Sequence, residues 1–538
     1  MNDNKGNEPA RLLQQAFVLH RDGRLVEACR LYERVISIQP AHPNALPMLA
    51  ALKYQSKDVF AALSFFNRAL RVGLQPASTF FNRGLALQEL GRFNDAILSY
   101  NSSVTLKPGY AEAFNNIGNI YRELTFYDKA ESSYARARHA DPMIEESYNN
   151  KGNLLREVRR FEEALKNYNY ALIINPGNAV SHSNLGVSAQ EMRRLGIAEK
   201  CFERSTLIDP QFVDAHLNRA LLFLLRGEFD RGWGLYEWRL RQDAIKSSNY
   251  DGLGVTWRGE GNIVGKRLLV HCEQGLGDSI QFVRYLPKVR DFGANVTLQV
   301  QKPLVQLFSN LGFAEQVISE NSTPPVVDVR CPLLSLPYVF KTTLETIPAN
   351  TPYILPDPEK VAIWRKVLGP RSRPRVGLVW SGRMDNRYHA NRSVPLKTLL
   401  PLLELPVEWH SLQKGFEESD KALLDRETRI CRHEENFDDT AALIQCLDLV
   451  ISVDTSIAHL AGAMGKTVWV LLPFVPDFRW LLDRDYSPWY PSARLFRQDQ
   501  SRNWSVVVHT VKKLLSESIR SQGAPSSSVL ADNITLMF

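Results

Sequence analysis

The first half of the chain repeats its pattern of small, aromatic and apolar residues every 34 positions. Single positions of this frame hold one kind of residue: Pro40, Pro108, Pro142, Pro176 and Pro210; Ala28, Ala62, Ala96, Ala130, Ala164 and Ala198; Tyr32, Phe66, Tyr100, Tyr134, Tyr168, Phe202 and Tyr236; and Gly84, Gly118, Gly152 and Gly186. A helical hairpin accounts for the pattern, because glycine and alanine let two helices touch and the ring fills the next gap. Proline ends the second helix because it has no amide donor. The pattern predicts seven hairpins over residues 9–243, starting near residues 9, 43, 77, 111, 145, 179 and 213.

The seventh hairpin departs from this frame. Ala220 stands where glycine is expected, Gly232 stands where alanine is expected, and the closing proline is absent. We expect a terminal repeat of this kind to pack against a different part of the protein.

From about residue 256 the pattern changes to apolar strands that alternate with helices, which predicts parallel sheets. The Pro-, Gly- and Arg-rich segment 366–375 is typical of a linker, so we expect two Rossmann-like lobes, 256–365 and 374–520. Residues 521–538 have the composition of a disordered tail. Ligands of such sheets bind beyond the carboxyl ends of the strands, and the loops there should carry the site.

Composition narrows the function classes. The net charge of +7, from 65 basic and 58 acidic residues, suits a small anionic substrate and is too weak to indicate nucleic acid. The polar start of the chain does not resemble a signal peptide, and no apolar run reaches the roughly 18 residues needed for membrane insertion. The six cysteines form no CxxC pair, which is typical of reduced thiols. We therefore expect a cytoplasmic protein without disulfides or structural zinc.

The segment EQGLGDSIQ, residues 273–281, follows the first predicted strand of the first lobe. Gly275 and Gly277 would let the backbone turn sharply, and Asp278 would stand at the start of the next helix. Asp278 is a candidate catalytic base. The alternative is that it only caps the helix.

The segment ISVDTSIAHLAGAMGK, residues 451–466, lies at the same kind of strand-to-helix junction in the second lobe. Asp454 ends the strand, Thr455 and Ser456 open the helix, and His459 follows on the same face. The free amides at a helix start attract anions, so these residues could hold a diphosphate. The alternative is a buried helix with a capping aspartate and a core histidine.

Two further segments follow strands of the second lobe. Arg383, Arg387 and Arg392 could neutralise a diphosphate through their guanidinium groups, unless they form a solvated basic loop. The aromatic segment 476–496 could line the site or pack between the lobes, and the sequence leaves both open.

The 34-residue frame resembles the tetratricopeptide repeat, whose stacked hairpins form a superhelix with a concave groove. One position on the first helix of each pair holds asparagine: Asn82, Asn116, Asn150, Asn184 and Asn218. A carboxamide can pair with a peptide backbone, and this column is similar to the asparagine ladder of O-GlcNAc transferase, which holds acceptor polypeptides. The alternative is that asparagine is simply common at this position of the repeat.

The two strand-to-helix motifs, one in each lobe, resemble those of the bacterial heptosyltransferase group over about residues 256–515. The resemblance implies that Asp278 is the base and that Asp454, Thr455 and His459 bind the nucleotide, with Gly275, Gly277 and Ser456 beside them. Gln413 and Lys414 are similar in placement to residues that contact the donor in O-GlcNAc transferase, although their spacing differs.

The whole chain resembles bacterial flagellin glycosyltransferases. The implied fold is an all-α tetratricopeptide superhelix followed by an α/β GT-B domain. The implied activity is inverting, metal-independent and cofactor-free transfer from a nucleotide-sugar to a protein hydroxyl, with flagellin as the first acceptor to consider. Two alternatives remain: transfer to a glycan or lipid, and a non-catalytic scaffold.

Overall fold

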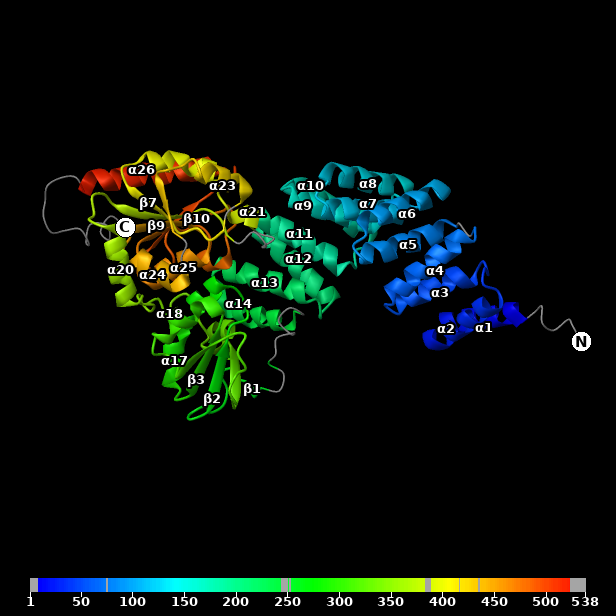
Figure 1. Ribbon diagram of the computed structural model, residues 1–538, viewed down its shortest axis with the longest axis horizontal. Coiled ribbons are helices and arrows are strands. Elements are labelled where there is room, and N and C mark those ends of the chain that lie inside the picture. The colour runs from blue at the N-terminus through cyan, green and yellow to red at the C-terminus, as the bar shows by residue number, and fades with distance from the viewer. Residues whose placement is uncertain are drawn as a thin grey trace, which may run out of the picture. The chain divides into compact units, whose positions relative to one another are not determined.

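The computed structural model describes residues 8–73, 76–242, 250, 253–382, 389–415, 417–433 and 436–522. These fall into two compact units (Figure 1). The first contains the described residues up to Ala189 together with Leu207–Asp209. The second contains Gln190–Thr206 and the described residues from Pro210 onward. The unit boundary therefore lies inside the sixth predicted repeat, before the predicted end of the array at residue 243.

The first unit is built from helical hairpins in which each helix packs on its neighbours in the chain. Its helices are α1 (Glu8–Arg21), α2 (Leu25–Ile38), α3 (Ala45–Gln55), α4 (Val59–Arg71), α5 (Ala77–Glu89), α6 (Phe93–Leu106), α7 (Ala111–Glu123), α8 (Tyr127–Ala140), α9 (Glu145–Glu157), α10 (Phe161–Ile174) and most of α11 (Ala179–Glu191). The predicted hairpin positions agree with these bounds.

The glycine and tyrosine positions of the frame contact each other directly. A Cβ atom on Gly152 would lie 2.5 Å from Cε1 of Tyr168, and one on Gly118 would lie 2.6 Å from Cε1 of Tyr134. Both tyrosines are fully buried. The frame therefore needs glycine where the ring of the second helix presses on the first, as the sequence predicts.

The second unit holds two parallel sheets. The first sheet has the strands β1 (Val255–Thr256), β2 (Arg267–His271), β3 (Asn295–Val300), β4 (Gln316–Ser319) and β5 (Val329–Pro332) in the order β1-β5-β2-β3-β4. The second has β6 (Arg375–Val379), β7 (Glu408–Ser411), β8 (Ile430–Arg432), β9 (Leu449–Val453), β10 (Val468–Leu472) and β11 (Ala493–Arg497) in the order β11-β10-β9-β6-β7-β8. The central strands β6, β9 and β10 are buried along their whole length, as expected for parallel strands covered on both faces.

Helices connect these strands, and the longer α26 follows the last strand. In the first lobe they are α16 (Leu276–Phe282), η2 (Val283–Tyr285), α17 (Leu286–Asp291), η3 (Lys302–Leu304), α18 (Val305–Ser309), η4 (Leu333–Ser335) and α19 (Leu336–Val339). In the second lobe they are α20 (Pro358–Leu368), α21 (His389–Arg392), α22 (Leu396–Leu399), η5 (Leu400–Glu404), α23 (Glu418–Leu424), α24 (Phe437–Gln445), α25 (Ser456–Ala463), η6 (Phe478–Trp480) and α26 (Trp504–Gln522). The predicted lobe boundary at residue 365 cuts α20, which packs on α24. The chain has thus crossed to the second lobe before the predicted linker at 366–375. The tail predicted at 521–538 lies outside the described residues from 523 onward.

The seventh repeat belongs to the second unit. It consists of α13 (Val213–Arg226), α14 (Phe229–Tyr236) and η1 (Glu237–Arg241), preceded by α12 (Leu195–Ile208). Trp233 of α14 is buried and donates a hydrogen bond from Nε1 to the carbonyl of Thr342 at 3.1 Å. The expectation that this repeat packs against a different part of the protein is confirmed.

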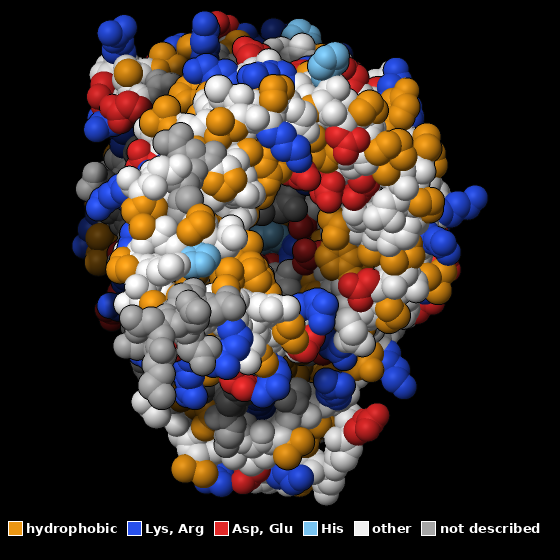
Figure 2. All heavy atoms as spheres, turned by 90° about the vertical axis from the view of Figure 1, so that its right-hand side faces the viewer, with side chains coloured by type: hydrophobic (Ala, Val, Ile, Leu, Met, Phe, Trp, Pro, Cys, Tyr) orange, Lys and Arg blue, Asp and Glu red, His pale blue; other side chains and the backbone are white. Residues whose placement is uncertain are grey.

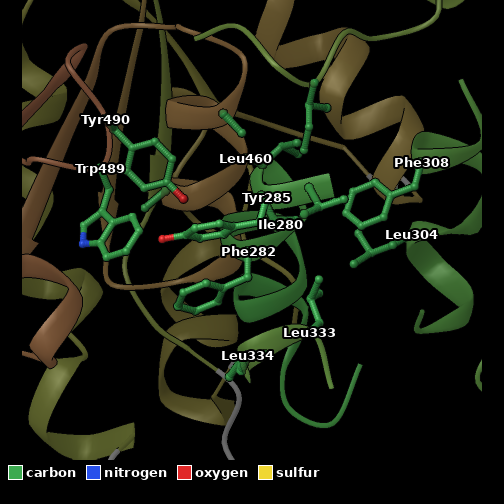
Figure 3. Close-up of a cluster of buried hydrophobic side chains, with 14 of the residues drawn as sticks. Ile280, Phe282, Tyr285, Leu304, Phe308, Leu333, Leu334, Leu460, Trp489 and Tyr490 are labelled. Carbon is green, nitrogen blue, oxygen red and sulfur yellow. The ribbon is translucent and has the colours of Figure 1, made fainter. Parts of the chain in front are cut away.

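One hydrophobic core joins the seventh repeat to both lobes. In Figure 3, Phe282 and Tyr285 of the first lobe lie close to Trp489 and Tyr490 of the second. A second core covers the other face of the second sheet beneath α26. Basic, acidic and apolar side chains are interspersed over the face drawn in Figure 2. Among the described residues, no helix is long and apolar enough to span a membrane.

Candidate functional site

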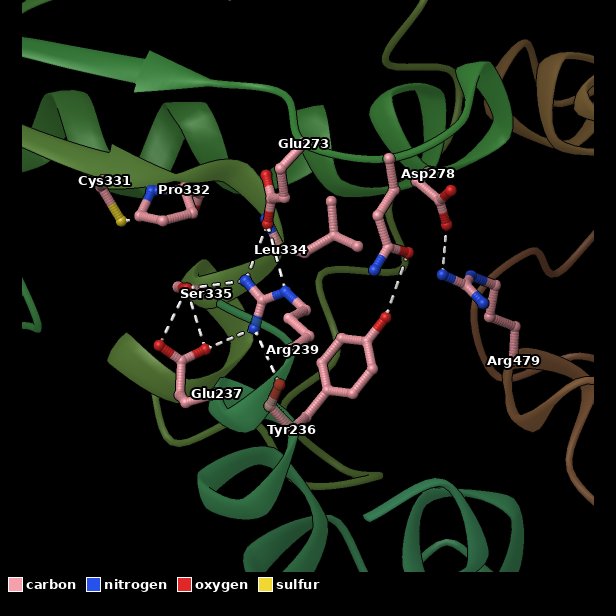
Figure 4. A network of polar contacts seen from close by, with 11 residues as sticks. Tyr236, Glu237, Arg239, Glu273, Asp278, Cys331, Pro332, Leu334, Ser335 and Arg479 are labelled. Carbon is pink, nitrogen blue, oxygen red and sulfur yellow. Dashed lines mark hydrogen bonds and ion pairs between the residues drawn. The ribbon is translucent and has the colours of Figure 1, made fainter. Parts of the chain in front are cut away.

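The first predicted motif forms the turn between β2 and α16. Gly275 caps α16, and its amide donates to Oδ2 of Asp278 at 2.8 Å. Asp278 is thus not the N-cap itself, but its side chain caps the helix start from the third helical position, as in a capping box. This cap uses one carboxylate oxygen, while the other oxygen accepts a hydrogen bond from Arg479 of the second lobe (Figure 4).

The second predicted motif joins β9 to α25. Thr455 is extended and precedes Ser456, the first residue of α25, and its hydroxyl lies 3.0 Å from Oγ of Ser452. His459 is buried, its Nδ1 lies 2.9 Å from the Tyr490 hydroxyl, and its Nε2 lies 3.8 Å from Oδ1 of Asp454. The imidazole also stacks on the Trp480 ring at 5.2 Å between centroids. His459 is therefore a buried histidine with a hydrogen-bonding partner, as the alternative interpretation of this motif predicts.

The two motifs, far apart in the sequence, meet in space where α16 packs on α25. A Cβ atom on Gly277 would lie 2.9 Å from Cδ2 of His459 and 3.4 Å from Cα of Ser456. Neither Gly275 nor Gly277 has a left-handed φ, so the turn between β2 and α16 does not depend on the backbone region that only glycine adopts freely. Gly277 is instead needed because a side chain there would separate the two lobes at the site.

The residue that sequence reasoning missed is Arg479. It lies on η6, beyond the carboxyl end of β10, and pairs with Asp278 and with Oδ1 of Asp477 at 2.8 Å. Its side chain is 9% exposed and that of Asp278 is 19% exposed, so this ion pair is largely shielded from solvent. The sequence offered one signal, a charged Asp477-Phe478-Arg479 run directly after a buried strand, inside a segment noticed only for its aromatic residues.

The aromatic segment 476–496 serves both roles that the sequence left open. Trp480 stacks on His459 at the site, whereas the Trp489 carbonyl accepts a hydrogen bond of 2.6 Å from Nη1 of Arg284 in the first lobe. Trp480, near the start of the segment, thus lies at the site, and Trp489, farther along it, packs between the lobes.

Burial dominates the electrostatics of the site. It raises the pKa of Asp278, with Arg479 opposing the shift, and it raises the pKa of Asp454 to about 6, with the charge of Asp477 adding to the effect. Burial and the nearby Arg479 hold the pKa of His459 well below its usual range, which keeps the imidazole neutral. The site therefore combines carboxylates of raised pKa, a neutral histidine and buried guanidinium groups.

The predicted arginine loop is represented by Arg392. Its guanidinium lies against Gly382, where a Cβ atom would be 2.7 Å from Nη2, and its charge lowers the pKa of Asp278 and Asp454. Arg383 and Arg387 lie outside the described residues.

Gln413 is buried at the carboxyl ends of β6 and β7. Its Oε1 accepts from the amides of Trp380 at 3.1 Å and Ser381 at 3.0 Å, and its Nε2 donates to the Ser381 carbonyl at 3.0 Å. The carboxamide thus holds two strand-exit loops together. Lys414 beside it is exposed.

The five asparagines of the repeat column are all partly buried. Nδ2 of Asn150 donates to Oδ1 of Asn115, and Nδ2 of Asn184 donates to Oδ1 of Asn149, both at 3.1 Å. These two carboxamides therefore link the fifth and sixth repeats each to the preceding one, a structural role that the sequence did not reveal.

Over the part of the chain that the structure describes, no three His, Cys, Asp or Glu side chains form a group that could hold a metal ion.

Comparison with known proteins identifies the repeats. Two tetratricopeptide-repeat family descriptions match residues 77–110 and 115–179. Protein FlbA of Caulobacter vibrioides is 29% identical over 331 residues, which cover 56% of this chain and 54% of FlbA. The chain thus spans about half the length of this curated relative.

Among solved structures, a tetratricopeptide repeat protein from Parabacteroides merdae is 18% identical with a TM-score of 0.38, covering 46% of this chain and 95% of its own. YrrB, described as a TPR protein with an unusual peptide-binding site, is 18% identical with a TM-score of 0.29, covering 34% of this chain and 95% of its own. The chain contains tetratricopeptide repeats, joined to a domain of parallel sheets and helices.

Proposed function

We propose that the protein is a glycosyltransferase that moves a sugar from a nucleotide-sugar to a serine or threonine hydroxyl of a protein, and that its two lobes form a GT-B domain. One observation carries the proposal. The Asp278 turn of the first lobe and the Asp454–His459 motif of the second meet at Gly277, and Asp278 pairs with the buried Arg479 there. A carboxylate and anion-attracting groups at one point are what transfer from a sugar diphosphate requires.

In the proposed reaction, the acceptor hydroxyl oxygen bonds to the anomeric carbon as the bond from that carbon to the diphosphate oxygen breaks. Asp278 takes the hydroxyl proton, and the diphosphate leaves with the electron pair. A single displacement of this kind inverts the anomeric centre and needs one base and no covalent intermediate.

The departing charge is stabilised from the second lobe. The first amides of α25 at Thr455 and Ser456 form an anion site, and Arg479 and Arg392 supply fixed positive charge. Arg383 and Arg387 are proposed to add to it. The neutral His459 can donate a hydrogen bond to a phosphate oxygen without carrying a charge of its own.

Burial makes Asp278 a stronger base than an exposed aspartate, whose pKa is about 3.9. Arg479 opposes this effect while it pairs with Asp278. A diphosphate that shares the Arg479 guanidinium weakens this opposition, so donor binding should strengthen the base.

The repeats are proposed to bind the acceptor. A tetratricopeptide groove suits an extended polypeptide, and YrrB is described as having a peptide-binding site. The asparagine column offers carboxamides along the array, although two of its members also link repeats. Flagellin is the acceptor that the sequence resemblance puts first. A glycan or lipid acceptor would leave the chemistry unchanged.

The second candidate is a protein-binding scaffold without activity. This candidate is favoured because the site residues already bond to groups of the same chain. Both Asp278 oxygens, Gln413 and His459 have such partners.

Replacing Asp278 with asparagine distinguishes the two. The variant keeps the size of the side chain but loses the base, so transfer should fall about 10²- to 10⁴-fold. We would complement a deletion strain of the native host with wild type, Asp278→Asn, or Asp291→Asn, an exposed control at the end of α17. Intact masses of flagellin and of proteins bound to the repeats give the readout. A sugar-sized mass lost only with Asp278→Asn supports the transferase. Full modification by Asp278→Asn contradicts the assigned base, and no modification with wild type favours the scaffold.

A further inference from the structure

We infer that Tyr236 and Arg239, at the end of the last repeat, are positioning residues for Asp278 and Arg479. The inference rests on the proposed function in that it gives this pair a catalytic role. It assigns the seventh repeat to the site, in addition to any binding by the rest of the array.

Arg239 holds the first residue of the Asp278 turn. Its guanidinium is 1% exposed and donates to Oε1 of Glu273 at 2.7 and 3.3 Å, to Glu237 at 2.6 Å and to Ser335 at 2.8 Å (Figure 4). The amide of Leu334 donates to the same Glu273 oxygen at 3.2 Å. Glu273 is thereby fixed between the repeat and the strand exits of the first sheet.

Tyr236 holds the next residue. Its hydroxyl donates to Oε1 of Gln274 at 3.2 Å, and the Gln274 carbonyl accepts from Nε2 of Gln301 at 2.5 Å. The following amide, that of Gly275, donates to Asp278. A continuous path of hydrogen bonds and adjacent peptides therefore runs from the repeat to the carboxylate.

The same helix reaches the second lobe. The Tyr236 ring lies 5.8 Å from that of Phe478, which precedes Arg479, and Trp233 lies 6.0 Å from Phe478 and 6.2 Å from Phe282 of α16. The seventh repeat thus contacts the elements that carry both members of the Asp278–Arg479 pair.

The repeat frame shows that the Tyr236 hydroxyl is not needed for the hairpin itself. In the fourth and fifth repeats the tyrosine hydroxyl donates within its own hairpin, Tyr134 to Asn119 at 2.8 Å and Tyr168 to Asn153 at 2.9 Å. The sixth repeat lacks both groups and has Val187 and Phe202 at these positions.

The seventh repeat keeps only one of the two groups. Leu221 replaces the asparagine, yet Tyr236 retains its hydroxyl. The third repeat has the same combination, Leu85 and Tyr100, but its hydroxyl donates to Gln88 of its own hairpin, a position that Leu224 occupies in the seventh. The Tyr236 hydroxyl bonds instead to Gln274 of the site turn. The sixth repeat shows that phenylalanine would satisfy the packing, so the hydroxyl serves the turn.

The test compares Tyr236→Phe with Tyr134→Phe, a variant that loses a hydrogen bond of the same kind within the array. Hydrogen–deuterium exchange of the full chain is followed in peptides covering residues 272–282, because this readout does not depend on activity. Tyr236→Phe should raise amide exchange there about 2- to 10-fold, as expected for the loss of one hydrogen bond, and Tyr134→Phe should leave it unchanged.

Transfer kinetics give the second readout. Tyr236→Phe should lower kcat by a similar factor with the KM for the nucleotide-sugar unchanged, because the lost hydroxyl holds the Asp278 turn while the retained ring still packs on Phe478 beside Arg479. Unchanged exchange in residues 272–282, an equal effect of Tyr134→Phe, or unchanged kcat would each overturn the inference. If wild type transfers no sugar, the proposed function fails, and the exchange result alone decides whether the repeat holds the turn.

Discussion

The fifth and seventh repeats follow the same 34-residue frame but face different neighbours. The fifth, α9 and α10, packs within the first unit, whereas the seventh packs against both lobes of the second. In the fifth, glycine lies on the first helix, where Gly152 receives the Tyr168 ring. In the seventh, it lies on the second helix, where Gly232 receives Leu224 of the first. The two hairpins, which have different outer neighbours, thus also differ in where their two helices come closest.

Charged residues differ in the same way. Arg160 of the fifth repeat pairs with Glu131 and Glu163 at a surface where its side chain is 42% exposed. Arg239 of the seventh pairs with Glu237 and Glu273, and Glu273 is only 2% exposed. The distances within these ion pairs are similar, but their burial differs. We therefore expect the buried pairs of Arg239 to contribute more to the free energy of unfolding than the exposed pairs of Arg160.

The largest expected effect comes from Arg239→Met. Removing this guanidinium leaves Glu273 buried without its counter-charge, which should lower the free energy of unfolding of the second unit by about 3–5 kcal/mol. All ten tryptophans lie at or after Trp233, so fluorescence in urea reports on this unit alone.

Arg160→Met is the matched change in the first unit. Its exposed pairs should contribute about 1 kcal/mol or less, measured by circular dichroism at 222 nm. Equal losses in the two variants would remove the distinction between the two repeats.

An intermediate effect is expected from Asp454, whose pKa burial raises to about 6. The folded state then holds this proton more tightly than the unfolded state does, so stability falls as the pH rises from about 4 to about 6. The loss amounts to at most about 3 kcal/mol, from a shift of about two pKa units.

Asp454→Asn should remove this dependence, and it should be more stable than wild type above pH 6. Urea unfolding followed by tryptophan fluorescence at pH 4, 5, 6 and 7 measures it. Asp291→Asn, which changes an exposed carboxylate of α17 in the same unit, serves as control. A stability difference between Asp454→Asn and wild type that does not change with pH would contradict the raised pKa.

The smallest effects concern the two glycines. Gly152→Ala places a Cβ atom against the rigid Tyr168 ring and should cost about 1–3 kcal/mol. Gly232→Ala meets the flexible end of Leu224, and alanine favours the helix by about 1 kcal/mol, so the two contributions should nearly cancel. Circular dichroism for the first variant and fluorescence for the second distinguish them. A larger loss of stability for Gly232→Ala than for Gly152→Ala would show that the seventh repeat is more tightly packed than the fifth.

The sequence predicted the repeats well because each position of the frame recurs and reports the same local contact. It also located the junctions at Asp278 and Asp454, where a buried strand gives way to a helix start. It did not predict Arg479, because this residue gains its role only when the exit of β10 meets α16. It likewise missed β5, whose four residues lie between β1 and β2 in the sheet although they follow β4 in the chain. Such pairings between distant segments leave no periodic signal.

The attachment of the array through its last repeats has a consequence for how this architecture can vary. Helices of the first unit contact mainly their neighbours in sequence, so a whole repeat can be gained or lost there without altering the seventh. The length of the array would then change in steps of 34 residues, while the seventh repeat keeps its contacts with Glu273 and Gln274 of the Asp278 turn. Duplication or deletion of a repeat would thus lengthen or shorten the array and leave the residues around Asp278 unchanged.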